Sequence, residues 1–211
     1  MRTKTLVLTA LLGIAASPLF AQTNVYSVNA VGYVQQVLQP GVFQMIANPL
    51  NTTNNTLASV MPSMPNGTTI YKWNGSTYAN STFLFGSWTQ PSFTLNPGEG
   101  CFIKLGGAAP LTNTWVGEVM QGNLTNTVLV GFSILSSIVP QTGDVTALGL
   151  TAGANNGDTV YQFHADTQGY TSSTFLFGSW NPGAPTISVG EAFFMKANVQ
   201  RDWTRNFSVN N

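Results

Sequence analysis

The octapeptide Ser-Thr-Phe-Leu-Phe-Gly-Ser-Trp occurs twice in this chain, at residues 81–88 and again at residues 173–180. Eight identical residues in the same order do not recur by chance, so the chain contains an internal duplication. Shorter matches surround the octapeptide, pairing residues 43–48 with 132–137, 66–73 with 156–163, and 98–104 with 190–196. The spacing between matched segments grows along the chain. The sequence therefore predicts a tandem repeat of about 90 residues, with insertions in the connections of the second copy.

The repeated segments are typical of β-strands. Residues 69–73 and 100–104 are short runs rich in β-branched and aromatic side chains, and Asn-Gly, Pro-Gly and Gly-Gly pairs bound them. The only weak helix candidate is residues 56–61. The sequence predicts an all-β fold made of two tandem antiparallel units, each sandwich-like or barrel-like.

The repeat also predicts how the chain is divided. We expect a signal peptide at residues 1–21, an N-terminal extension or strand at 22–30, a first β repeat at 31–115 and a second at 116–211. Residues 116–119 match the start of the first copy and also align with the end of the second copy, which leaves no linker. The two units should therefore pack together directly, without a flexible tether.

The N-terminus has the pattern of an export signal. Arg2 and Lys4 precede a short apolar run, and small residues follow it, with cleavage expected after Ala21 or, alternatively, after Ser17. The alternative interpretation of this segment is a membrane anchor, but the apolar run is much shorter than the roughly 20 residues that cross a bilayer. The sequence predicts a secreted protein, located in the periplasm, at the cell surface or outside the cell, that does not span a membrane.

Charge and composition exclude several classes of protein. Lys and Arg number 7, as do Asp and Glu, so charged residues make up 7% of the chain against roughly 25% in ordinary soluble proteins. Nucleic-acid binding needs clustered Lys and Arg, which this chain lacks. With Cys 1 and His 1, neither a disulfide framework nor a His/Cys metal site is expected. We therefore predict no metal and no cofactor.

Two segments carry a resemblance to known proteins. Residues 25–34 (Val-Tyr-Ser-Val-Asn-Ala-Val-Gly-Tyr-Val), followed by residues 43–50, resemble secreted tandem β-repeat proteins of Verrucomicrobia-like bacteria. The Pro-Gly-Glu-Gly-aromatic motif at residues 97–102 is similar to a β module of bacterial surface and secreted proteins; residues 189–192 of the second copy lack its Pro and second Gly. The resemblance implies an exported β-repeat protein. It carries over no functional residue, because that family has no established activity.

Repeated aromatic residues are the candidate ligand-binding residues. Phe83 and Phe85 are predicted to share one face of a strand in the core, as are their copies Phe175 and Phe177. Tryptophans beside turns can pack in the core or stack on sugars, and the tyrosines upstream are the more exposed aromatics. The candidates for sugar stacking are Trp88, Trp180, Tyr78 and Tyr170.

Other reactive side chains fit structural roles better. Glu99 and Glu191 are equivalent and could bind calcium or sugar, but without an Asp-rich loop a carboxylate that accepts backbone N–H bonds in its turn is the preferred interpretation. Cys101 matches Phe193, which indicates a packing position. His164 lacks a nucleophile or carboxylate at motif spacing, so it is not assigned as a base.

These observations predict a non-enzymatic structural or adhesive β-repeat protein of the cell envelope or extracellular matrix, able to self-assemble as a homo-oligomer or to bind another envelope protein. Exposed strand edges such as residues 25–34 offer backbone groups for strand addition by a neighbour, which suggests head-to-tail assembly. The alternative is a carbohydrate-binding module that stacks polysaccharide on the repeated aromatics. A hydrolase would need a cleft with two unpaired carboxylates.

Overall fold

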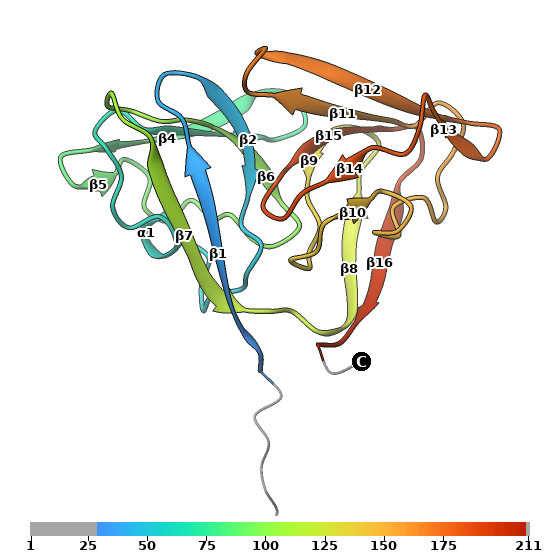
Figure 1. The fold of residues 1–211 in the computed structure, drawn as a ribbon, viewed down its shortest axis with the longest axis horizontal. Helices are drawn as coiled ribbons and strands as arrows, with labels where there is room; N and C mark the ends of the chain where they lie inside the picture. Colours follow the sequence, from blue (N-terminus) through green and yellow to red (C-terminus); the bar gives the residue numbers. More distant parts are fainter. Residues whose placement is uncertain (1–28, 210–211) are drawn as a thin grey trace, which may run out of the picture.

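A computed structural model describes residues 29–209, which form two β units in sequence (Figure 1). The predicted signal peptide and nearly all of the predicted extension lie outside the described residues. The first unit contains β1 (Val31–Leu38), β2 (Phe43–Ala47), α1 (Leu57–Val60), β3 (Thr69–Trp73), β4 (Tyr78–Leu84), β5 (Ser87–Trp88), β6 (Gly100–Lys104) and β7 (Leu111–Glu118). The single turn of helix falls inside the weak helix candidate.

The second unit repeats this plan with strands alone. It contains β8 (Gly122–Val128), β9 (Gly131–Leu135), β10 (Gly143–Asp144), β11 (Thr159–His164), β12 (Gly169–Leu176), β13 (Ser179–Asn181), β14 (Thr186–Ile187), β15 (Phe193–Ala197) and β16 (Arg201–Phe207). Within residues 29–209, no helix is long and apolar enough to cross a membrane. The all-β prediction is confirmed.

Each unit is a five-stranded antiparallel sheet covered by a two-stranded ribbon. The first sheet has the order β2-β6-β3-β4-β5 and the second β9-β15-β11-β12-β13, while β1 pairs with β7 and β8 with β16. Even the register is repeated, since Phe43 lies opposite Lys104 and Phe132 lies opposite Lys196. The two halves therefore share one plan, as the duplicated sequence predicts, and differ in that the first contains α1 and the second a small additional sheet of β10 and β14.

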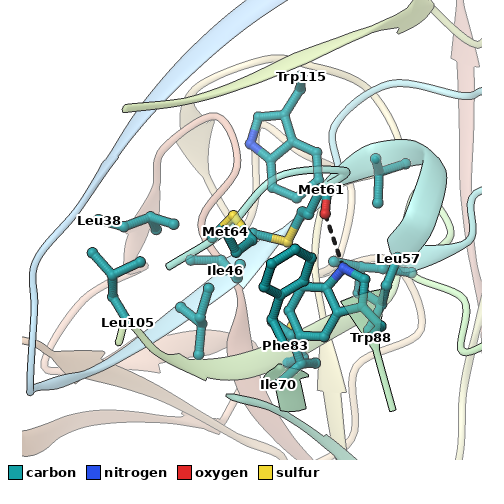
Figure 2. Packing of buried hydrophobic residues seen from close by; sticks show 14 of the residues in the cluster. Leu38, Ile46, Leu57, Met61, Met64, Ile70, Phe83, Trp88, Leu105 and Trp115 are labelled. Atoms are coloured by element: carbon teal, nitrogen blue, oxygen red, sulfur yellow. Dashed lines mark hydrogen bonds between the residues drawn. The ribbon is translucent and has the colours of Figure 1, made fainter. Parts of the chain in front are cut away.

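The core of each unit fills the space between sheet and ribbon. In the first unit Trp115 of β7 and Trp88 of β5 are buried with Ile103, and the Trp88 ring N–H donates to the carbonyl of Met61 at 2.8 Å (Figure 2). Strand alternation explains the pattern, because every second side chain of β7 turns inward. In the second unit Trp203 of β16 enters the core in the same way.

The boundary between the units differs from the expected one. β7 pairs with β1 over its whole length up to Glu118, and β8 opens the second unit at Gly122, so the boundary falls at residues 119–121 and not between 115 and 116. Residues 116–119 match the start of the first copy in sequence, but the strand equivalent to β1 is β8. The expected absence of a linker holds, since three residues join the two units.

The units meet through reciprocal backbone hydrogen bonds. The amide of Ala47 donates to the carbonyl of Gly190 at 2.8 Å, and the equivalent amide of Ser136 donates to the carbonyl of Gly98 at 3.0 Å. The side-chain amides of Gln36 and Asn126 reach the same two carbonyls, at 3.0 Å and 2.8 Å. Contact of equivalent groups in both directions is the property of a two-fold interface.

The junction is also apolar. Between the two sheets lies a cluster of buried side chains, supplied by β2 and β6 of one unit and by β9 and the turn before β15 of the other: Met45, Ala47, Phe102, Ile134 and Ala192. Burial of such side chains makes the junction resemble a domain core more than a loose inter-domain contact. We expect the two units to move as one body.

Candidate functional site

The four candidate ligand-binding aromatics separate into two groups. Trp88 and Trp180 are 3% and 7% exposed, each packed in the core of its own unit. Tyr78 and Tyr170 are 41% and 49% exposed. The structure therefore places the tryptophans among the core residues and brings only the two tyrosines together, on one surface formed by both units.

The tyrosines line an aromatic pocket at the junction of the two sheets. The pocket has a volume of about 380 Å³. Its walls come from β2, β3, β4 and β6 of the first unit and from the β11–β12 hairpin of the second: Phe43, Tyr71, Tyr78, Phe102, Phe163, Gln168 and Tyr170. Six of these seven side chains are aromatic, so the pocket is suited to an apolar or ring-shaped group.

Ring packing around the pocket follows the duplication. Phe163 meets Tyr170 and Phe102 edge-on, with ring centroids 5.1 Å apart in both cases. On the other side of the junction Trp73 makes the equivalent contacts, at 5.1 Å to Tyr78 and 6.2 Å to Phe194. Edge-to-face geometry is the preferred arrangement of aromatic pairs.

The copies differ at the pocket in one side chain and in the length of one turn, since four residues separate the paired Trp73 and Tyr78 whereas six separate Phe163 and Tyr170. Trp73 and Phe163 are equivalent positions, and the larger Trp73 extends across the junction to donate its ring N–H to the carbonyl of Phe132 at 2.9 Å. Phe163 is smaller, has no ring N–H and lines the pocket. The pocket is therefore an asymmetric feature of a nearly symmetric junction.

Gln168 forms the rim of the pocket and ties the two units together. Its Oε1 accepts from the amide of Phe43 at 3.1 Å, and its Nε2 donates to the carbonyl of Phe43 at 2.9 Å. Gln168 sits in the β11–β12 turn with φ 50°, a left-handed conformation that side chains other than Gly and Asn seldom adopt. The turn is held in this conformation where it contacts the neighbouring unit.

The electrostatics of the pocket favour neutral hydroxyls. Partial burial raises the pKa of Tyr170 to about 12, and the nearby Tyr78 adds to this effect. Burial also raises the pKa of Tyr78. The ammonium of Lys104 lies 5.5 Å from the ring centroid of Phe43, where a cation is attracted by the ring face. The pocket offers six aromatic rings, the hydroxyls of Tyr71, Tyr78 and Tyr170 and the side-chain amide of Gln168, with no carboxylate among its lining residues.

The octapeptide contains a second pair of exposed aromatics, contrary to the expectation that they lie on the core face of a strand. Phe83 and Phe175 are buried as expected, but Phe85 and Phe177 are 94% and 92% exposed. Each strand ends one residue earlier, at Leu84 or Leu176, so the next phenylalanine stands at the tip of a hairpin turn and not on the strand face. The apolar pattern of the octapeptide hid this turn.

Both tips have the same unusual backbone. Phe85 has φ 53° and Phe177 has φ 52°, and a glycine with positive φ follows each of them. Two successive residues with positive φ make a type I′ turn, which normally carries Asn-Gly. The side-chain oxygens of Asn66 and Asn156 accept the amides of Phe85 and Phe177, both at 2.9 Å.

The repeated glutamates serve the turns. Glu99 Oε2 accepts from the amide of Asn96 at 2.8 Å, and Glu191 Oε2 accepts from the amide of Ser188 at 2.9 Å. Glu99 also pairs with Lys72 at 3.0 Å. The interpretation as turn acceptors is confirmed. Within residues 29–209, no group of three or more His, Cys, Asp or Glu side chains is placed to hold a metal ion.

Cys101 is packed in the core of the first unit, and His164 is hydrogen-bonded on the surface of the second. Cys101 is completely buried, as its match to Phe193 predicts, and burial raises its thiol pKa to about 12. A thiol in this state is a poor nucleophile. His164 Nε2 lies 2.8 Å from the hydroxyl of Thr171 on the neighbouring strand.

Comparisons with protein-family models, with curated proteins and with solved structures gave no match.

Proposed function

We propose that this chain is an exported, non-enzymatic structural or adhesive protein of the cell envelope or extracellular matrix, which associates with copies of itself or with neighbouring proteins. The observation that carries the proposal is the display of Phe85 and Phe177 at hairpin tips. A bulky apolar side chain gains nothing from a strained, solvent-exposed turn in an isolated molecule. Its burial by a partner supplies the missing stabilisation.

The placement of the tips supports a connecting role. The β4–β5 and β12–β13 turns lie toward opposite ends of the long axis of the molecule (Figure 1). The units between them are joined by the apolar junction, which fixes the direction in which each tip points. A rigid block with the same contact at both ends is suited to link two neighbours.

Composition and the N-terminal pattern support the same proposal. With 7 basic and 7 acidic residues, net charge does not oppose close approach of copies. The signal-peptide pattern and the resemblance to secreted tandem β-repeat proteins support export. Glu99 and Glu191 are engaged by backbone amides of their own turns, which supports a role other than catalysis.

Sedimentation velocity of the purified protein over a wide concentration range tests this proposal. We expect the weight-average mass to rise with concentration and to change little between low and high salt, because the association is apolar. A protein that remains monomeric at all concentrations, and that binds no component of its native envelope or matrix, would exclude the proposed function.

A second candidate function is carbohydrate binding at the junction pocket. Tyr78 and Tyr170 favour it, because both rings are about half exposed and both line the same pocket. Calorimetric titration with a panel of soluble polysaccharides tests this candidate. Binding that is lost in Tyr78→Ala and Tyr170→Ala but kept in Tyr33→Ala, an exposed tyrosine outside the pocket, would support it. Absence of heat for every glycan would exclude it.

A further inference from the structure

We propose that the phenylalanine tip of one copy inserts into the aromatic junction pocket of a second copy. This inference rests on the proposed function and names the contact through which self-association occurs. Two observations carry it independently, namely the exposed phenylalanines at the hairpin tips and the unfilled pocket at the junction.

The tip presents an exposed apolar ring on an ordered turn. Phe85 stands alone at the apex of a two-residue turn, flanked by Leu84 and Gly86, with no charged residue in the octapeptide. Asn66 holds the turn amide, so the backbone that carries the ring is already ordered before contact. A preordered apolar ring loses little conformational entropy when it is buried.

The pocket has the size and the aromatic walls to accept this side chain. Its volume is about 380 Å³, whereas an apolar cavity of roughly 150 Å³ binds benzene. A benzyl side chain and part of its turn therefore fit. Phe102 and Phe163 in the walls already pack edge to face against each other, with ring centroids 5.1 Å apart, and an entering ring can join this cluster in the geometry that aromatic side chains prefer.

The contact must form between copies. The rings of Phe85 and Phe177 are exposed in their own chain, and the hairpins that carry them lie toward the two ends of the molecule (Figure 1). The pocket lies between the ends, where the two sheets meet. A tip and a pocket on different parts of the surface make a heterologous contact, which builds a closed ring or an open filament according to the rotation between neighbouring copies.

The duplication suggests a substitution that should fill the pocket. Phe163→Trp places at the pocket the residue that Trp73 provides at the equivalent position, where the indole occupies the junction. We expect this variant to fold, because the junction already accommodates a tryptophan there. Trp73→Phe is the matched control. It changes the equivalent position on the opposite side of the junction, which does not line the pocket.

The test combines these variants with a direct map of the contact. Sedimentation velocity compares the wild type, the double variant Phe85→Ser/Phe177→Ser, Phe163→Trp, Trp73→Phe and the surface control Val130→Ser. We expect association to weaken about tenfold or more in the double variant and in Phe163→Trp. Association should be retained in the two controls.

Photocrosslinking then identifies the partner surface. A photoreactive benzoyl derivative of phenylalanine replaces Phe85, and the protein is mixed with an isotopically labelled wild-type copy. Crosslinks between the labelled and unlabelled chains at peptides containing Tyr78, Phe102, Phe163 or Tyr170 would support the insertion, and this readout does not depend on the folding of the pocket variant.

Two different failures are distinguishable. If the wild type and the double variant associate equally well, the insertion is wrong and the proposed function stands. The same conclusion follows if the crosslinks map to a surface other than the pocket. If the wild type stays monomeric at every concentration, both the insertion and the proposed self-association are wrong.

Discussion

Gln168 of the second unit holds the backbone of Phe43 in the first by two hydrogen bonds, one in each direction, at 3.1 Å and 2.9 Å. Phe43 lies at the start of β2, an edge strand of its sheet. The two residues therefore join separate units at the rim of the pocket and fix one of its walls.

Removal of this clamp should loosen the rim. Gln168→Ala deletes both hydrogen bonds to Phe43 and a third, from Nε2 to the carbonyl of Ala165 at 2.7 Å. We expect the free energy of unfolding to fall by about 1 kcal/mol, with faster hydrogen exchange at the amide of Phe43. Gln168→Glu keeps the acceptor for that amide and should protect it more than alanine does. Measurement by NMR-detected exchange checks this, and an amide of Phe43 that exchanges in Gln168→Ala at the wild-type rate would contradict it.

Phenylalanine at each hairpin tip should make the fold less stable than the residue that the turn prefers. Phe85→Asn and Phe177→Asn place the preferred residue in each type I′ turn, and we expect each to stabilise the fold by about 0.5–1 kcal/mol. The double variant should raise Tm by roughly 2–4 °C per kcal/mol, as measured by calorimetry at a concentration where the protein is monomeric. An unchanged or lower Tm would show that the turns carry no strain.

The fold was predictable because two levels of the sequence agree. The repeat predicts two similar units, and short β-branched and aromatic segments between turn pairs predict strands such as β3 and β6. The boundary was misplaced because residues 116–119 resemble residues 31–34 in sequence, whereas the chain uses β8 as the counterpart of β1. Strand pairing depends on tertiary contacts that no local pattern contains.

The candidate site was predictable in part. Tyr78 and Tyr170 were selected because they precede the repeated strand, and both line the pocket. Phe43, Phe102 and Phe163 were missed, since their convergence requires the two sheets to meet. One signal was available: Trp73 matches Phe163, and such a difference between otherwise similar copies marks a position where one unit departs from the other.

The close approach of the two units at Gly100 provides a test of the junction. A Cβ at Gly100 would lie against the Cβ of Ala192 and 2.6 Å from Cγ2 of Ile134. Gly100→Ala should therefore destabilise the protein by about 1–3 kcal/mol through overpacking. Adding Ala192→Gly should restore part of that loss, and Gly183→Ala, which meets open space, is the neutral control. Equal stability of all these variants in urea would contradict the packing.

The hydroxyl of Tyr170 should lose its proton at a higher pH than an exposed tyrosine does. Burial raises the pKa of Tyr170 from 10.0 to about 12, with Tyr78 contributing. Because the folded state holds the proton more tightly than the unfolded state, this stabilisation is fully present below pH 10 and is lost as the pH rises toward 12. The difference between wild type and Tyr170→Phe in absorbance near 295 nm should have its midpoint near pH 12. A midpoint near 10 would place the hydroxyl in open solvent.

Equilibrium unfolding in urea tests most directly whether the duplicated units act as one body. The account predicts a single transition, with fluorescence and far-ultraviolet circular dichroism coinciding, and the same opening free energy for the slowest-exchanging amides of β6 and β15. Two separated transitions, or one unit that exchanges through a much lower barrier than the other, would contradict it.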